Sequence, residues 1–240
     1  MKTKIVLLAG FLILVIPGLS FSQFPTSINQ LLGTSAGGLT EKDATDGIRE
    51  ALVKGTGESV KLVSAVNGYL ANAEIKIPFP QEAKDVETKL RAIGLGSQVD
   101  EVVVSINRAA EDAAKSAEPV FVAAIRGMSI TDAINIVKGN NDAATRYLAK
   151  TTTPELKAKF SPVIKASLDR VDATRLWAEV IGRYNQIPFV NRQNPDLTAY
   201  VTEKAIAGLF IMVTKEEAKI RKDPAAQATE LLRKVFGNVK

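Results

Sequence analysis

Apolar residues recur along this chain at spacings of three and four, which is the spacing of one face of an α-helix. Clear rows of this kind cover residues 48–73, 99–110 and 197–213. No stretch shows the sustained two-residue alternation of a half-buried strand. We therefore predict an all-α fold without a sheet, a multi-helix orthogonal or bundle-like globule of about eight to ten helices.

Two capping motifs mark expected helix starts in the second half of the chain. Ser129 is followed three residues later by Asp132, and Thr152 is followed at the same interval by Glu155. Pro154 is tolerated in the second case because a proline in the first turn of a helix loses no hydrogen bond. We expect one helix to begin at each motif, and an earlier helix to end shortly before Thr152.

Two expected connections share the sequence Ile-Pro-Phe. The first, residues 75–80, contains two prolines, which remove backbone donors and favour extended conformations in the residues before them. The second, residues 184–194, is the longest connection that the pattern predicts. Because Ile and Phe prefer the core, we expect both segments to anchor against the helices.

A binding cleft is the alternative interpretation of the second connection, since long irregular connections in compact domains are often functional. The flanking helices bring aromatic, amide and charged side chains close to it in sequence. The candidate ligand-binding residues are Arg175, Trp177, Tyr184, Asn185, Arg192, Tyr200 and Glu203. No residue is assigned a catalytic role.

The first 22 residues have the pattern of a secretory signal peptide. Lys2 and Lys4 precede an apolar run over residues 5–16, and the small residues Ser20 and Ser22 precede an expected cleavage site after Ser22. The run is shorter than the roughly 20 apolar residues of a membrane span, although retention as an anchor stays open. No Cys follows the run, so we exclude lipid attachment and expect a periplasmic or secreted protein.

The mature chain is expected to begin with a flexible lead over residues 23–40, which is rich in Gly, Ser and Thr. Residues 41–240 have the size of a single domain. A sub-division of this all-α domain near residue 128 stays open.

The sequence contains neither Cys nor His, which limits its chemistry. Disulfides, thiol catalysis, Ser-His-Asp catalysis and the usual zinc sites each need one of these residues. Catalysis would have to use carboxylates, Lys, Arg, Tyr or hydroxyl groups. We assign no metal ligands and expect no cofactor.

Three carboxylates, Glu203, Glu216 and Glu217, fall on or near one expected helix. Helix-bundle metal sites combine such carboxylates with His, which this sequence lacks. Glu217 and Arg221 are four residues apart, the spacing of an ion pair on a helix surface. We therefore interpret the group as a solvated helix face.

Residues 139–142 lead into another expected helix, and helix N-termini attract anions. Arg146 follows one turn later and would favour an anion, whereas Asp142 would repel one. We prefer the interpretation that these residues are an ordinary helix start and hold no anion.

Short motifs distributed over the mature chain, most densely between Ser129 and Gly237, resemble a family of bacterial envelope proteins, the domain of unknown function family 4197. They include Ala173-Thr174-Arg175 with Trp177, Asn194-Pro195-Asp196-Leu197 with Tyr200-Val201-Thr202, Gly208-Leu209-Phe210, and the closing Leu231-Leu232-Arg233-Lys234-Val235-Phe236-Gly237. The resemblance implies an export signal and a helical structure, but no activity or ligand. Many members of the family carry a lipid-attachment Cys after the signal. Its absence here favours a free periplasmic form.

We expect an exported, non-catalytic binding or interaction protein of the cell envelope, whose target is an envelope protein or a small ligand. A carboxylate-dependent hydrolase acting on envelope glycans is one alternative. Another is a peripheral membrane protein in weak contact with an anionic surface, since Lys and Arg outnumber Asp and Glu by 18 to 12 from Thr131 onward. Nucleic acid is not expected, because acidic residues are interleaved with the basic ones and an exported chain seldom meets it.

Overall fold

The computed structural model describes residues 41–80, 83–92, 94, 96–186, 188–189, 192, 194 and 196–222. The predicted signal peptide and the expected flexible lead lie outside these residues. The described helices are α2 (Glu41–Ser64), α3 (Lys84–Ala92), α4 (Gly96–Ala114), α5 (Ala117–Arg126), α6 (Ile130–Lys138), α7 (Ala143–Asp169), α8 (Ala173–Tyr184) and α9 (Leu197–Lys222).

The all-α prediction is confirmed, and no described residue belongs to a strand. Only the turn at Lys115 and Ser116 separates α4 from α5, so the two helices together form one interrupted rod. The described part of the chain therefore contains eight helices, or seven if this rod is counted as one helix, whereas about eight to ten were expected.

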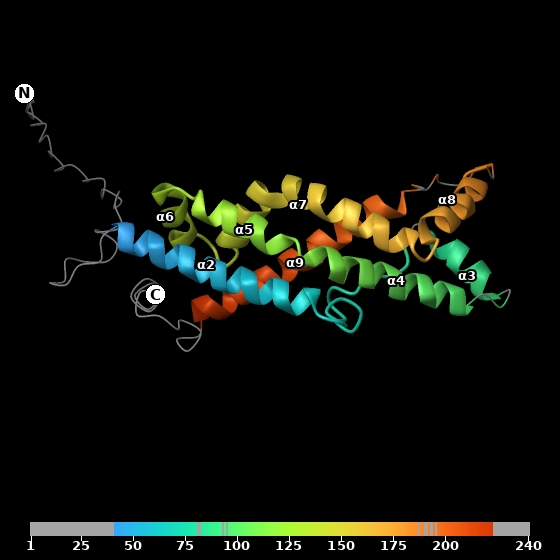
Figure 1. The fold of residues 1–240 in the computed structure, drawn as a ribbon, viewed down its shortest axis with the longest axis horizontal. Coiled ribbons are helices and arrows are strands. Elements are labelled where there is room, and N and C mark those ends of the chain that lie inside the picture. Colours follow the sequence, from blue (N-terminus) through green and yellow to red (C-terminus); the bar gives the residue numbers. More distant parts are fainter. Residues whose placement is uncertain are drawn as a thin grey trace, which may run out of the picture.

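The helices form an elongated bundle (Figure 1). α7 and α9 pack against each other along it, α2 packs on α9, and the α4–α5 rod packs on α7. α6 lies at one end of the bundle, and α3 and α8 lie at the other (Figure 1). The two connections singled out in the sequence reach the end that holds α3 and α8, since they lead into α3 and out of α8.

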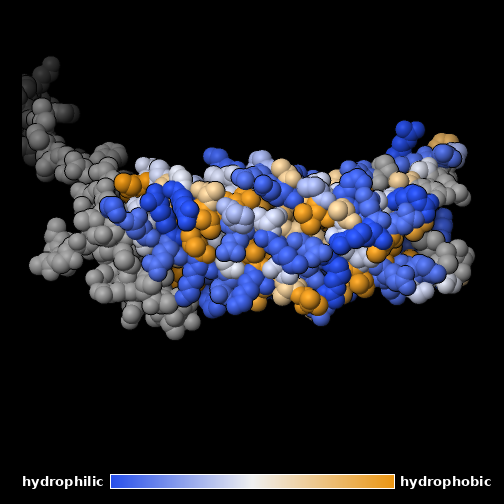
Figure 2. All heavy atoms as spheres, viewed as in Figure 1, coloured by the Kyte–Doolittle hydropathy of each residue, from blue (hydrophilic) through white to orange (hydrophobic). Residues whose placement is uncertain are grey.

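One apolar core runs through the bundle and takes residues from Ile48 to Val213. α9 lies at its centre, where Val201, Ala205 and Leu209 are fully buried. Among the described helices, α9 is by itself long and apolar enough to cross a membrane, and its buried face accounts for that composition in a bundle. The face of the molecule in Figure 2 shows apolar residues in small groups separated by hydrophilic side chains.

α7 runs without a break from Ala143 to Asp169, although it contains Pro154 and Pro162. The helix start expected at Thr152 is therefore wrong. The Thr152 hydroxyl donates to the carbonyl oxygen of Leu148 over 2.6 Å, an interaction within a helix rather than a cap. A proline inside a helix costs about 3 kcal/mol, and burial of an apolar row offsets this cost at about 1.5–3 kcal/mol for each large side chain. The row consists of Leu148, Leu156, Phe160, Ile164 and Leu168.

The capping box expected at Ser129 is confirmed at the start of α6. The Ser129 hydroxyl accepts a hydrogen bond from the backbone N–H of Asp132 over 3.1 Å. In return, the backbone N–H of Ser129 donates to the Asp132 carboxylate over 3.1 Å.

Hydrogen bonds with α4 and α9 fix residues 65–80, which lead from α2 to α3. The Asn107 side chain of α4 pairs with both backbone groups of Ile77, at 2.8 Å to its N–H and 2.8 Å to its carbonyl oxygen. The buried hydroxyl of Tyr69 donates to the carbonyl oxygen of Ala205 in α9 over 2.6 Å. This segment therefore enters the end of the bundle in a defined position.

Candidate functional site

A pocket of about 250 Å³ lies where the two connections meet the end of the bundle. Its lining comes from the connection before α3, from the second turn of α8 and the connection that follows α8, and from the first two turns of α9. Its described lining residues are Pro80, Ala83, Trp177, Asn194, Ala199, Tyr200 and Glu203. Its described lining combines apolar walls, two aromatic rings and one carboxylate.

Trp177 is held on one wall of the pocket by both connections. Its ring packs edge-on against Phe79, with ring centroids 5.3 Å apart. Its indole Nε1–H donates to the carbonyl oxygen of Asn194 over 3.3 Å. With only 7% of the residue exposed, Trp177 is positioned by contacts from segments that are distant in sequence.

Tyr200 forms a second wall from the first turn of α9. Its hydroxyl donates to the carbonyl oxygen of Pro78 over 3.2 Å. The ammonium nitrogen of Lys204 lies 5.8 Å from the centroid of the Tyr200 ring, within the range of a cation–π interaction. The turn itself is capped by Asp196, whose carboxylate accepts from the backbone N–H of Ala199 over 2.9 Å.

Glu203 supplies the carboxylate of the pocket from the second turn of α9. Lys157 of α7 donates to it over 3.1 Å. The Glu203 side chain is 66% exposed and that of Lys157 is 51% exposed, so water screens this ion pair. The Glu203 carboxylate can therefore separate from Lys157 and pair with another cation.

Three of the seven candidate ligand-binding residues line this pocket: Trp177, Tyr200 and Glu203. Arg175 does not, and its guanidinium instead donates to the Asp172 carboxylate over 2.9 Å. This ion pair holds the pKa of Asp172 below its usual value.

The other three candidates also lie outside the pocket lining. Tyr184 is half-buried and packs against the main core. Asn185 continues the end of α8 through its backbone N–H, which donates to the carbonyl oxygen of Ile181 over 2.9 Å. Arg192 is exposed.

The expected anchoring of the two Ile-Pro-Phe segments holds for only one of them. Ile77 and Phe79 are buried, and Phe79 supports Trp177. Phe189 is fully exposed and has a positive φ of 65°, so the expectation that it anchors in the core is wrong. Ile187 lies outside the described residues.

Sequence reasoning missed Pro80, Ala83, Asn194 and Ala199 as lining residues. Asn194 takes part in its interaction with Trp177 through a backbone carbonyl, which any residue could supply. The repeated Ile-Pro-Phe sequence was the available signal for the first connection, but it does not indicate which helix that connection contacts.

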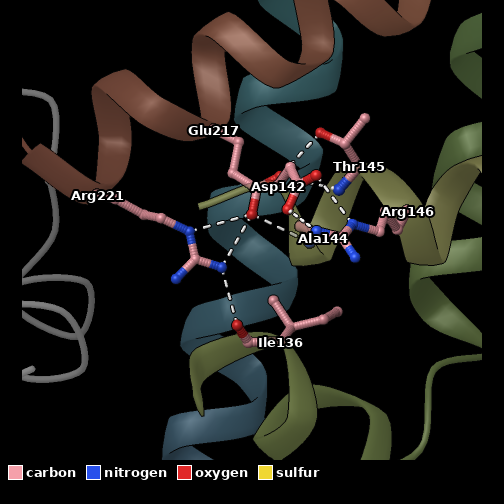
Figure 3. A network of polar contacts seen from close by, with 7 residues as sticks. All are labelled: Ile136, Asp142, Ala144, Thr145, Arg146, Glu217 and Arg221. Carbon is pink, nitrogen blue, oxygen red and sulfur yellow. Dashed lines mark hydrogen bonds and ion pairs between the residues drawn. The ribbon is translucent and has the colours of Figure 1, made fainter. Parts of the chain in front are cut away.

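A second polar site lies at the opposite end of α9, where Glu217 contacts the N-terminus of α7 (Figure 3). The Glu217 carboxylate accepts from the backbone N–H groups of Ala144 and Thr145 over 3.0 and 2.9 Å. The Arg221 guanidinium donates to the same carboxylate over 2.9 Å and to the carbonyl oxygen of Ile136 over 2.8 Å. This network fastens α6, α7 and α9 together.

Of the three α9 carboxylates interpreted as a solvated face, Glu203 is 66% exposed and Glu216 only 15% exposed. The interpretation is wrong for Glu217. Its side chain is 6% exposed and that of Arg221 is 11% exposed, so the pair is buried. The sequence spacing of four residues is the same for a surface pair and for a buried pair. In the described part of the chain, no three His, Cys, Asp or Glu side chains come together as a metal site.

Glu217 is also the anionic group found at the helix N-terminus that follows residues 139–142. The N-terminus of α7 does hold an anionic group, but that group is this internal carboxylate. Asp142 pairs with Arg146 over 2.6 Å, and this contact lowers the pKa of Asp142.

An open groove of about 560 Å³ lies between α4 and the start of α8. Val104, Val171 and Leu176 line it and are 42%, 53% and 46% exposed. Asp100 and Glu101 add carboxylates to its lining. The volume of this groove is about twice that of the pocket at Trp177.

A family model described as "Protein of unknown function (DUF4197)" matches residues 38–237. The chain belongs to this family. The match covers all of the described helices and both connections of the pocket. Neither the curated proteins nor the solved structures gave a match.

Proposed function

We propose that this DUF4197 protein is an exported, non-catalytic binding protein of the cell envelope that takes a small ligand in the pocket at Trp177 and Tyr200. The observation that carries the proposal is the convergence of both connections on these two rings. Phe79 and the Asn194 carbonyl hold Trp177, and the Pro78 carbonyl holds Tyr200. A preformed apolar pocket with a few placed polar groups is typical of ligand sites.

The lining of the pocket favours binding over catalysis. Hydrolysis of a glycan by two carboxylates needs them about 5–9 Å apart across the substrate. Among the described lining residues, Glu203 is the one carboxylate, and its charge is balanced by Lys157. This arrangement can orient a ligand but does not supply an acid and a base.

Filling the pocket tests the proposal. Ala199 lines it, whereas Ala207 is exposed on the same helix, so Ala199→Phe and Ala207→Phe form a matched pair. Isothermal titration calorimetry with a panel of amines, sugars, short peptides and fatty acids should give saturable binding for at least one class. We expect that binding to survive in Ala207→Phe and to be lost in Ala199→Phe, at similar melting temperatures.

Absence of binding by every class would contradict the proposal. So would equal binding by the two variants, because the ligand would then occupy a different place.

A partner protein is the second candidate target, and the apolar groove between α4 and α8 favours it. The exposed side chains of Val104, Val171 and Leu176 suit an apolar segment. Glu101 adds an acidic group beside them, whereas Asp100 is already paired with Arg91 over 2.7 Å. Leu176→Asp should then abolish complex formation measured by analytical ultracentrifugation, while ligand binding at Trp177 is unchanged. Complex formation that survives Leu176→Asp would exclude the groove.

A further inference from the structure

We infer that the pocket at Trp177 and Tyr200 binds an ammonium group carried on an apolar stem, an inference that depends on the proposed function of this pocket. The ammonium would contact the Glu203 carboxylate, and the stem would lie along Pro80 and Ala83. Free amines and the lysine side chains of peptides share this chemistry.

The polar groups of the pocket favour a donor rather than an acceptor. The indole N–H of Trp177 is already bonded to the Asn194 carbonyl, and the hydroxyl of Tyr200 is bonded to the Pro78 carbonyl. Among the described lining residues, Glu203 carries the one full charge, and an ionised carboxylate only accepts hydrogen bonds. A ligand that donates from a cation therefore matches these groups, whereas a carboxylate or phosphate would face Glu203.

Two ammonium groups of the chain already contact groups of this lining, the Glu203 carboxylate and the Tyr200 ring. Lys157 donates to Glu203 over 3.1 Å, and Lys204 lies over the Tyr200 ring at 5.8 Å from its centroid. Both lysines approach from outside the lining, on flexible side chains in contact with water. They indicate that this carboxylate and this ring accept an ammonium group, and that a ligand would compete with Lys157.

The apolar walls of the pocket indicate that the ligand carries an apolar stem. Pro80, Ala83 and Ala199 present aliphatic carbon, and Trp177 and Tyr200 present aromatic carbon. A volume of about 250 Å³ admits a short alkyl chain with its ammonium head. A bare ammonium ion would leave these walls uncovered.

The single tryptophan of the chain reports on this pocket directly. Trp177 emission can be followed during titration with hexylammonium, with hexanol as the neutral isostere and hexanoate as the anion, at constant ionic strength. N-acetyl-lysine methylamide presents the ammonium on a peptide unit. We expect saturation by an ammonium probe and not by hexanol or hexanoate, and the tighter of the two ammonium probes identifies the source.

Two substitutions should change the affinity in opposite directions. Glu203→Gln keeps the shape and removes the charge, and we expect about tenfold weaker binding of hexylammonium. Lys157→Gln removes the competing ammonium, and we expect about threefold tighter binding. Glu118→Gln on α5 and Lys159→Gln on α7 change exposed charges outside the pocket lining and should leave the affinity unchanged.

Weaker binding in Lys157→Gln, or no change in Glu203→Gln, would overturn the inference. Saturation by hexanoate or hexanol in place of hexylammonium would also overturn it, while the pocket would stand as a binding site. No response of Trp177 to any probe, together with no calorimetric binding by the wider panel, would contradict both the inference and the proposed function.

Discussion

Tyr200 donates its hydroxyl hydrogen to the carbonyl oxygen of Pro78 over 3.2 Å, which joins residues 122 positions apart in the sequence. The bond connects the first turn of α9 to the connection that supports Trp177 through Phe79. This bond is one of the contacts that hold the two aromatic walls of the pocket beside each other.

The ring of Tyr200 should matter more to binding than its hydroxyl. Tyr200→Phe removes one exposed hydrogen bond and should cost about 0.5–1.5 kcal/mol of unfolding free energy. It keeps the aromatic wall, so ligand affinity should stay within about threefold of the wild type. Tyr200→Ala removes the wall and should abolish binding in calorimetry. Equal binding by the two variants would show that the ring is not part of the site.

Removal of one partner of the buried Glu217–Arg221 pair should destabilise the fold strongly. Glu217→Gln leaves the Arg221 guanidinium buried without its countercharge and should lower the unfolding free energy by about 3 kcal/mol in urea. Glu216→Gln is the control, since Glu216 lies on the same helix and contacts Lys219 at 3.5 Å without entering the network. Similar losses in both variants would contradict the central position of Glu217.

The capping box of α6 should give stability that is lost in acid. Hydrogen bonds from Ser129 lower the pKa of Asp132 below its ordinary value in the folded chain. The ionised form is therefore favoured by folding, and its contribution is present above about pH 4 and lost as the pH falls through the lowered pKa. Asp132→Asn should be less stable than the wild type at pH 7 by about 1 kcal/mol. In urea unfolding, this difference should shrink at pH 3, and a constant difference would contradict the assignment.

Two glycines inside helices should respond in opposite ways to alanine. Gly57 of α2 has open space where a Cβ would lie, so Gly57→Ala should stabilise by about 0.5–1 kcal/mol through helix propensity. At Gly208 of α9 a Cβ would stand 2.8 Å from the ring of Tyr69, which is buried and bonded to Ala205. Gly208→Ala should therefore destabilise by about 1–3 kcal/mol. Thermal unfolding measures both, and stabilisation by Gly208→Ala would show that the Tyr69 ring is mobile.

Local patterns predicted the helices well, because apolar spacing and caps act within a few residues. The Ser129 capping box formed as expected, whereas the start expected at Thr152 did not form. The difference is tertiary: Thr152 lies on the buried row of α7, and packing of that row outweighs the effect of Pro154. Glu217 was predicted on a solvated face for a related reason. Its spacing of four residues from Arg221 is the same in an exposed pair and in a buried pair.

The lining of the candidate pocket was predicted only in part. Trp177, Tyr200 and Glu203 were found because they flank the long connection. Arg175 was grouped with Trp177, but residues two apart on a helix point to different sides. Pro80 stands nearly a hundred residues before Trp177, and a single sequence carries no signal that pairs them.

The indole N–H signal of Trp177 reports on whether a ligand occupies this pocket. The chain has one tryptophan, so a ¹H–¹⁵N correlation spectrum contains one indole cross-peak, and this N–H faces the Asn194 carbonyl beside the pocket. Titration of the wild type with hexylammonium should shift that cross-peak in a saturable way, and the shift should be absent in Ala199→Phe. An indole signal that stays in place while the ligand binds, or that shifts equally in Ala199→Phe, would contradict binding in this pocket.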